Sequence, residues 1–386
     1  MANGQPKFSM TDRPSDAALN RAVLNRRRNM KTFVFPDTKL VALVLFTGGM
    51  VFASVGISAE GTQWEINPRI VPIPMGASQQ LQESLAATPV PDVEARKKIA
   101  DEDIDWMALI EQRASATPLD LPTLSKQLDL TIKSDEIEGV KVYHVMPNHP
   151  DPAFKDRLFL NVHGGSYVFG GGVASVGEAA VIANRAKIPV LSVDYRMPPN
   201  HPFPAAVEDT VIVYKHLLKS LPGKAIAIGG TSAGGGLALA AVHRFITLKL
   251  DVPGAIYAGT PWADLTKTGD SLFTNEGIDR VLVTYDGTLG AAARLYANGH
   301  DLQDPLISPV YGKFKGFPPT YLVTGTRDMF LSDTVRTHRK LRNAGVIADL
   351  NVYEGMSHGG YLVVPNSPES MQVYAELRDF LKQHLL

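Results

Sequence analysis

The sequence contains no cysteine, and its formal charge is almost balanced. Without cysteine among its 386 residues, the chain has no disulfide, no thiolate metal site and no cysteine nucleophile. The net charge of −1, from 38 basic and 39 acidic residues, excludes the basic footprint of a nucleic-acid-binding protein. No set of His, Asp and Glu stands at metal-ligand spacing, so we expect neither a metal nor another cofactor. What remains is an ordinary globular composition, 45% hydrophobic and 20% charged.

The first 59 residues differ in character from the rest of the chain. Residues 1–30 are polar and are interpreted as an extension ahead of a later start. An apolar stretch follows basic residues and ends in the small residues Ser58 and Ala59, as in a secretory signal peptide at about residues 30–59. Such a signal predicts a periplasmic or secreted protein with no stable membrane insertion after cleavage. Residues 40–59 approach the roughly 20 residues that span a bilayer, so an uncleaved membrane anchor is the alternative, and a buried helix a further one.

The most informative motif is Gly230 to Gly234, with Ser232 at its centre. It lies between an apolar run at 225–228 and a helix-forming run at 236–248. A Gly-x-Ser-x-Gly turn between strand and helix forces the serine into a strained corner with its hydroxyl exposed, and it requires small neighbours. Because the chain has 33 glycines, the pattern alone also fits a simple tight turn. The nucleophile interpretation therefore depends on the rest of the sequence.

Upstream of this turn, an apolar strand breaks into His163, Gly164 and Gly165. Glycines there let backbone N–H groups point into a cavity. Together with the N–H of Ala233, the residue after the serine, such donors form an oxyanion hole. The alternative is a glycine turn with a structural histidine.

Two more apolar strands, at 320–323 and 350–353, are followed by Asp328 and His358. The order serine, acid, histidine, with acid and base each behind a strand, is the α/β-hydrolase arrangement. Taken singly, Asp328 also fits a helix N-cap and His358 a loop histidine. Taken together in this order, the three residues favour a catalytic triad.

With these motifs the chain resembles the hormone-sensitive lipase family of α/β-hydrolases, the bacterial family IV esterases, from about Asp129 to the C-terminus. Thr231 stands where many members have Asp, as in the Gly-Thr-Ser-Ala-Gly branch of the family. Asn200 replaces a usual Glu, and Ser166 a common third glycine. The matching segments are 163–166, 194–206, 230–236, 261–265, 304–309 and the loops of the acid and the histidine.

The resemblance implies a serine carboxylic-ester hydrolase that acts on short-chain acyl esters, a class of small-molecule substrate, through an acyl-serine. A lactonase or a deacetylase of glycans or xenobiotics would use the same groups, and a non-catalytic ligand-binding homologue is a rival of another class. A homodimer is also expected. The implied roles are Ser232 as nucleophile, His358 as general base, Asp328 as its orienting acid, and Gly164, Gly165 and Ala233 as oxyanion donors, with His163, Tyr167, Thr231 and Trp262 as candidates for the substrate pocket.

The alternation of strands and helices predicts an α/β fold. Its sheet should be mostly parallel and eight-stranded, with helices on both faces and a helical cap. We expect N-terminal cap helices at 60–126, including one amphipathic helix over 93–113, and a catalytic domain at 127–386 with a cap insertion near 266–298. Asp333 is interpreted as a helix cap. Strands are predicted at 129–132, 140–145, 157–162, 190–193, 225–228, 254–258, 320–323 and 350–353, and helices at 176–186, 204–220, 236–248, 332–344 and 368–383.

Overall fold

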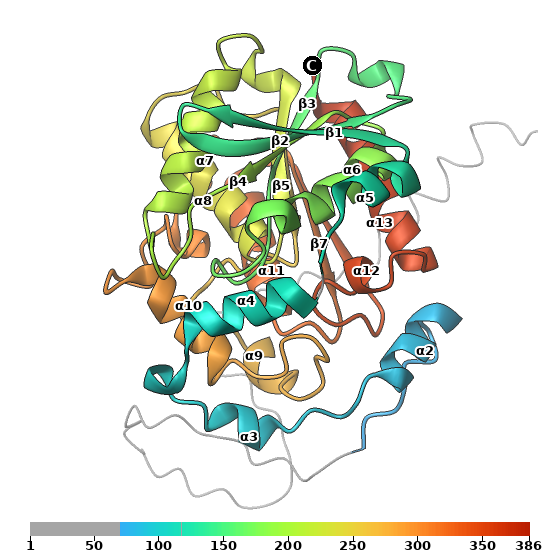
Figure 1. Cartoon of the computed structure of the whole chain (residues 1–386), viewed down its shortest axis with the longest axis vertical. Helices are drawn as coiled ribbons and strands as arrows, with labels where there is room; N and C mark the ends of the chain where they lie inside the picture. The colour runs from blue at the N-terminus through green and yellow to red at the C-terminus, as the bar shows by residue number, and fades with distance from the viewer. Residues whose placement is uncertain (1–69, 117) are drawn as a thin grey trace, which may run out of the picture. The chain divides into compact units, whose positions relative to one another are not determined.

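The computed structural model of the chain describes residues 70–116 and 118–386 (Figure 1). The predicted signal peptide and the alternative anchor at 40–59 lie outside the described residues, as do the first residues of the expected cap region. Among the residues that are described, no helix combines the length and the apolar character needed to cross a bilayer.

The centre of the fold is an eight-stranded sheet with the order β1-β2-β4-β3-β5-β6-β7-β8. The pairs β1–β2 and β2–β4 are antiparallel, and all the others are parallel. Glu138 and Gly139, both with positive φ, make the tight turn between β1 and β2. All eight predicted strands and the mostly parallel sheet are confirmed. The bounds are β1 Leu130–Ile137, β2 Val140–Pro147, β3 Leu158–Val162, β4 Val190–Asp194, β5 Ile226–Thr231, β6 Ala255–Gly259, β7 Thr320–Gly325 and β8 Ala348–Tyr353.

Helices cover both faces of the sheet. Every residue of β5, β6 and β7 is buried, as expected for parallel strands between two helical layers. One hydrophobic cluster joins the sheet to α7, α8 and α11, and a second cluster joins the other face to α6 and α13. The five helices predicted for the catalytic domain are therefore present. Their bounds are α6 Val176–Ala186, α7 Ala205–Leu217, α8 Ala233–Thr247, α11 Leu331–Asn343 and α13 Pro368–His384, and the short α12 spans Gly360–Val363.

The single helix predicted over 93–113 is instead two helices, α3 (Val93–Lys97) and α4 (Trp106–Ala116). Asp105 causes the break, because its carboxylate accepts the N–H of Ala108 at 3.0 Å and so begins a new helix. The prediction of one helix was wrong because the apolar spacing continues across Asp105 and gives no sign that a new helix begins there. The remaining helices before the sheet are α2 (Gln79–Ala87) and α5 (Leu121–Leu128).

The segment between β6 and β7 holds α9 (Ser271–Thr274) and α10 (Thr288–Ala297), within the range expected for the cap insertion. Trp106 and other apolar residues of α4 pack with Phe169 against Ala292 of α10, so the two segments meet although they are far apart in sequence (Figure 1). The rings of Trp106 and Phe169 are 6.2 Å apart. This contact places α4 and α10 beside the loop that follows β3.

Candidate active site

Ser232 occupies the corner between β5 and α8. Its φ of 63° and ψ of −125° are strained for a residue with a side chain. The backbone is held there because the N–H of Ser232 donates to the carbonyl of Gly259 at 2.8 Å. Side chains at Gly230 or Gly234 would collide with the carbonyl of Val162, so the neighbours of the serine must be small. Helix α8 begins at Ala233, immediately after the serine rather than at the predicted Gly236.

The loop after β3 presses against this corner. A Cβ on Gly164 would lie 2.6 Å from the carbonyl oxygen of Thr231, and Gly165 adopts a φ of 115°, which favours glycine. Within the described part of the chain, the N–H groups of Gly164, Gly165 and Ala233 donate to no acceptor. Three unused donors beside a serine that lines the cavity have the chemistry of an oxyanion site.

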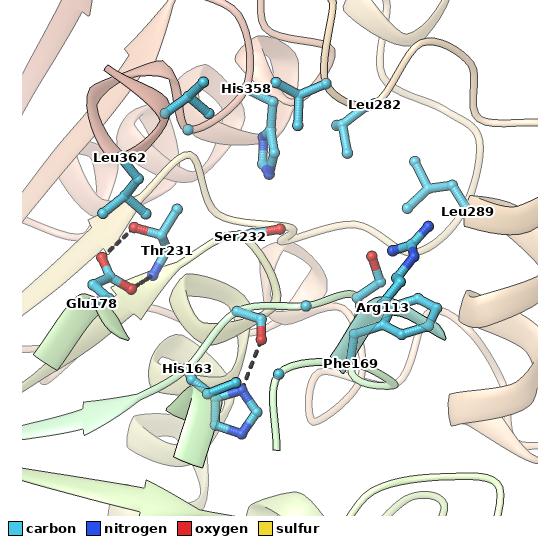
Figure 2. A pocket seen from close by; sticks show the side chains of 18 of the residues that line it. Arg113, His163, Phe169, Glu178, Thr231, Ser232, Leu282, Leu289, His358 and Leu362 are labelled. Atoms are coloured by element: carbon cyan, nitrogen blue, oxygen red, sulfur yellow. Dashed lines mark hydrogen bonds between the residues drawn. The ribbon is translucent and has the colours of Figure 1, made fainter. Parts of the chain in front are cut away.

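His163 braces this loop. Its Nδ1 lies 2.8 Å from the carbonyl of Gly164, which can only accept, so Nδ1 carries the proton. Tyr195 donates its hydroxyl to the carbonyl of His163 at 2.7 Å, and the two rings stack at 4.1 Å. Burial lowers the pKa of His163, which keeps the ring neutral. His163 lines the edge of the cavity, but Figure 2 shows its ring turned away from Ser232.

Asp328 and His358 contact each other at the wall of the cavity, which His358 lines. His358 Nδ1 lies 3.1 Å from Asp328 Oδ1, and both side chains are buried. Asp328 also accepts the hydroxyl of Thr324 at 2.9 Å and the N–H of Phe330 at 2.8 Å, which fix its orientation. Burial alone would lower the pKa of His358, but the charge and hydrogen bond of Asp328, together with the charge of Asp279, raise it.

Ser232 and His358 line the same cavity and face it from different loops (Figure 2). The bond to Asp328 uses Nδ1 of His358 and leaves Nε2 as the nitrogen available to a hydroxyl in the cavity. The structure thus places Asp328 and His358 in contact, and Ser232 on the cavity that His358 lines, with the three residues at the carboxyl ends of β7, β8 and β5.

Asp279 is a fourth participant that the sequence analysis missed. It is fully buried and comes from the segment between β6 and β7. Its Oδ2 accepts the N–H of Met329 at 2.9 Å and lies 3.4 Å from the N–H of His358, so it contacts both the acid loop and the base loop. Burial, together with the charge of Asp328, raises the pKa of Asp279 to about 6. A lone aspartate in the segment between two strands gives no sequence signal of this contact.

Glu178 is a second missed carboxylate, in the first turn of α6. It lines the cavity and binds both the N–H and the hydroxyl of Thr231, the residue before the nucleophile (Figure 2). One signal was available in the sequence, because Glu178 is the only acidic residue of its helix and is followed directly by the apolar run 179–183.

The cavity has a volume of about 430 Å³, within the range of small-molecule sites. Its wall is mainly apolar, with two arginines from α3 and α4. The guanidinium carbon of Arg113 lies 3.9 Å from the ring centroid of Phe169. The residues that line it beyond the serine, the histidine and the glycine loop include Arg96, Arg113, Phe169, Glu178, Thr231, Val281, Leu282, Leu289, Leu362 and Val363.

Two of the four pocket candidates do not reach this cavity. Thr231 and His163 line it, whereas Tyr167 and Trp262 lie in the core behind it, with 1% and 0% of their surface exposed. Tyr167 stacks on Tyr296 at 3.9 Å, and Trp262 stacks on Phe330 at 5.5 Å. The prediction for these two aromatics is wrong because their rings point into the packing that supports the loops.

The interpretation of Asp333 as a helix cap is also wrong. Helix α11 has no side-chain cap, and Asp333 is buried. Its Oδ2 accepts the N–H groups of Ala263 and Asp264 at 3.1 and 2.9 Å. Asp333 therefore fixes the loop after β6 rather than the end of its own helix.

Comparison with known proteins identifies the family. Residues 159–362 match the model of a family described as having the alpha/beta hydrolase fold, which is more than half of the chain. The chain also superposes on the crystal structure of an esterase E25 with a TM-score of 0.81 and 50% identity, covering 84% of this chain and 100% of that one. An esterase from the bacterial hormone-sensitive lipase family matches with a TM-score of 0.67 and 32% identity, covering 81% of this chain and 100% of that one. The chain belongs to the hormone-sensitive lipase family of α/β-hydrolases.

Relatives of this hormone-sensitive lipase family member are also named as hydrolases or esterases. An acetyl-hydrolase of Streptomyces hygroscopicus is 33% identical over 245 residues, which cover 63% of this chain and 81% of the relative. A protein named simply as an esterase, from Acinetobacter venetianus, is 31% identical over 227 residues, covering 58% and 74%. The chain is therefore a serine ester hydrolase that acts on small-molecule esters.

Proposed function

We propose that the chain hydrolyses short-chain acyl esters with Ser232 as nucleophile, His358 as general base and Asp328 as the residue that orients the base. The observation that carries this assignment is the buried Asp328–His358 hydrogen bond of 3.1 Å behind a cavity that Ser232 also lines. An unactivated serine hydroxyl is a poor nucleophile, so a histidine held by a carboxylate is the necessary companion.

The reaction proceeds in two halves. His358 Nε2 takes the proton of Ser232 Oγ as the oxygen attacks the ester carbonyl, and the N–H groups of Gly164, Gly165 and Ala233 hold the oxyanion that forms. The imidazolium gives its proton to the leaving alkoxide, which leaves an acyl-serine and a free alcohol. Water then repeats the sequence, releases the acid and restores the serine. Asp328 keeps the tautomer with Nδ1 protonated and steadies the imidazolium without taking its proton.

The size and walls of the cavity support short acyl chains. We infer that α3, α4 and the 266–298 segment form the cap, because Arg96 and Arg113 from the first two, and Val281, Leu282 and Leu289 from the third, close the cavity over Ser232. A volume of about 430 Å³ has room for a small ester but not for an extended long-chain acyl group together with a bulky alcohol.

Hydrolysis of a 4-nitrophenyl ester series from acetate to decanoate tests the assignment. We expect activity that is highest at short chains and absent in Ser232→Ala, with melting temperature unchanged. Persistent activity in Ser232→Ala would reject Ser232 as nucleophile. A maximum at decanoate would reject the short-chain preference, and turnover of lactones in place of the whole linear series would assign the same triad to a lactonase.

We also propose export through the signal peptide predicted at about residues 30–59. N-terminal sequencing of the mature protein checks this, with a start near Glu60 expected and a start at Met1 or Met30 contradicting it. The homodimer expected from the family resemblance stays a prediction, which sedimentation velocity of the purified chain tests.

A further inference from the structure

A chain of buried hydroxyl groups ends at Glu178, directly behind the nucleophile. Thr231, the residue before Ser232, donates its N–H to Glu178 Oε2 at 3.0 Å, and its hydroxyl makes a short hydrogen bond with Oε1. The hydroxyl of Tyr361 lies 2.7 Å from that of Thr231 and 3.0 Å from that of Tyr257. The mechanism above uses none of these groups.

This network joins the loops that carry the reacting groups. Glu178 lies in α6, which follows the glycine loop, Thr231 ends β5 just before the nucleophile, and Tyr361 lies in α12, three residues after His358. Gly259 at the end of β6 makes room for them, because a Cβ there would overlap the hydroxyl oxygens of all three network hydroxyls. One polar cluster therefore ties helix α6, the nucleophile corner and the segment behind the catalytic histidine to one another.

The charge of Glu178 sets the direction of the hydrogen bonds. An ionised carboxylate only accepts, so the single hydroxyl proton of Thr231 points to Glu178 and the lone pairs of Thr231 are left for a donor. Tyr361 supplies that donor, and Tyr257 donates to Tyr361 in turn. With Glu178 ionised, the Thr231 hydroxyl proton points to the carboxylate, and the bonds to the carboxylate are charge-assisted. The Tyr257 hydroxyl also lies 3.2 Å from that of Thr231, so it has a second acceptor within the same cluster.

This charge costs folding stability. Burial raises the pKa of Glu178 to about 7 even though hydrogen bonds from Thr231 act in the opposite direction. Because the folded pKa lies above the unfolded value of 4.5, the favourable contribution of this group is complete below about pH 4.5 and is lost as the pH rises through 7. A neutral amide at this position would avoid that cost in alkaline solution, so folding stability does not explain why a carboxylate stands here.

We propose that Glu178 is a positioning residue of ester hydrolysis, whose carboxylate fixes Thr231 and, through Tyr361, the histidine loop, so that Ser232 and His358 stay aligned. The proposal rests on the triad assigned above. Alignment matters most in the transition state, so loss of the charge lowers kcat while KM changes little.

The test compares Glu178→Gln with the wild type and with Glu208→Gln as a matched control. Glu208 is also a glutamate in the first turn of its helix, α7, but it is exposed. Steady-state constants for 4-nitrophenyl butyrate are measured from pH 5 to 9, with the melting temperature at pH 8.5. For Glu178→Gln we expect a kcat on the order of tenfold lower, corresponding to a modest loss of transition-state alignment, an unchanged KM, and a melting temperature equal to or above that of the wild type.

Tyr361→Phe is the second variant, because it removes one hydroxyl of the chain and no charge. A lower kcat in this variant as well supports the link from Glu178 to the histidine loop. A kcat equal to that of the wild type would refute the part of the proposal that runs through Tyr361. Wild-type kcat in Glu178→Gln at every pH, or a loss of activity accompanied by a lower melting temperature at pH 8.5, overturns the positioning role. Failure of the triad itself is seen separately, as activity that survives in Ser232→Ala.

Discussion

Replacing Asp279 with Asn removes a negative charge from beside the acid–base pair and keeps the size of the side chain. The Oδ2 atom of Asp279 accepts the N–H groups of Met329 at 2.9 Å and His358 at 3.4 Å. Its Oδ1 accepts those of Val281 and Leu282 at 2.9 and 3.2 Å. An asparagine has one carbonyl oxygen for these two pairs of donors, so its NH₂ group must face the other pair.

The effects of this change on stability nearly cancel. The NH₂ group disturbs least when it faces the partly buried N–H groups of Val281 and Leu282. Loss of both acceptors then costs about 2–4 kcal/mol, towards the lower end of the usual range of about 1–3 kcal/mol for each donor. Against this, burial and the charge of Asp328 raise the pKa of Asp279 from 3.8 to about 6, so at pH 8 the ionised form destabilises the fold by about 3 kcal/mol, which asparagine removes. The variant should therefore fold, with a free energy of unfolding within about 1–2 kcal/mol of the wild type at pH 8.

The effect on the base has a definite sign. The negative charge of Asp279 favours the imidazolium form and helps raise the pKa of His358. An opposite charge packed close to an ionisable group typically shifts its pKa by about 1–3 units towards the charged form. Catalysis requires neutral His358, so activity rises as the pH passes through its pKa. In the variant, the acidic limb of the kcat/KM profile should move to lower pH by about one to two units.

The assay is the pH dependence of kcat/KM for 4-nitrophenyl butyrate, followed at the isosbestic wavelength of nitrophenol. Glu276→Gln is the control, because this carboxylate lies in the same segment but bonds to Lys97 and Thr284 rather than to the triad loops. Its acidic limb should match that of the wild type, which is expected to have its midpoint above 6.5. A folded Asp279→Asn protein whose acidic limb does not move refutes the electrostatic reasoning.

The remaining predictions concern the residues that orient the base and the oxyanion loop. Asp328→Asn should lower kcat by about 10⁴-fold, since an amide favours the wrong tautomer of His358; single-turnover kinetics measure this, and a loss below about tenfold would contradict the assigned role. Tyr195→Phe leaves the buried carbonyl of His163 without its donor, so thermal unfolding should report a loss of stability of about 1–3 kcal/mol. Because this bond holds the glycine loop, kcat should fall as well. An unchanged kcat in the folded variant would show that the loop does not depend on this bond. Gly165→Ala places a side chain at a φ of 115° and against the backbone of Phe169, so most of the activity and part of the stability should be lost. Gly177→Ala is the control, because the Cβ meets open space there and the backbone φ is not positive.

The strands and the triad were predictable because their signals are local. A strand covered on both sides is a short apolar run, and each triad residue follows such a run directly, so position along the chain translates into position at the sheet edge. The same holds for helix α6, whose predicted bounds agree with the structure.

The supporting residues were not predictable because their partners are distant in sequence. Asp279 meets Met329 and His358 across 50 and 79 residues, and Glu178 meets Thr231 across 53. In the sequence, Asp279 looks like an ordinary solvated charge, and the apolar neighbours of Glu178 hint at its burial but not at its partner. The prediction that Tyr167 and Trp262 line the substrate pocket was wrong for a different reason. An aromatic side chain beside a motif can point into the cavity or into the core, and the sequence does not show which, because the packing around it decides.

Covalent trapping of the nucleophile tests the central claim most directly. The protein is incubated with a fluorophosphonate, and the modified peptide is identified by mass spectrometry while residual ester hydrolysis is measured. The account predicts one adduct per chain, on Ser232, with loss of activity in proportion to labelling and no labelling in His358→Ala on the same timescale. An adduct on another residue, or full activity in a protein labelled at Ser232, would contradict it.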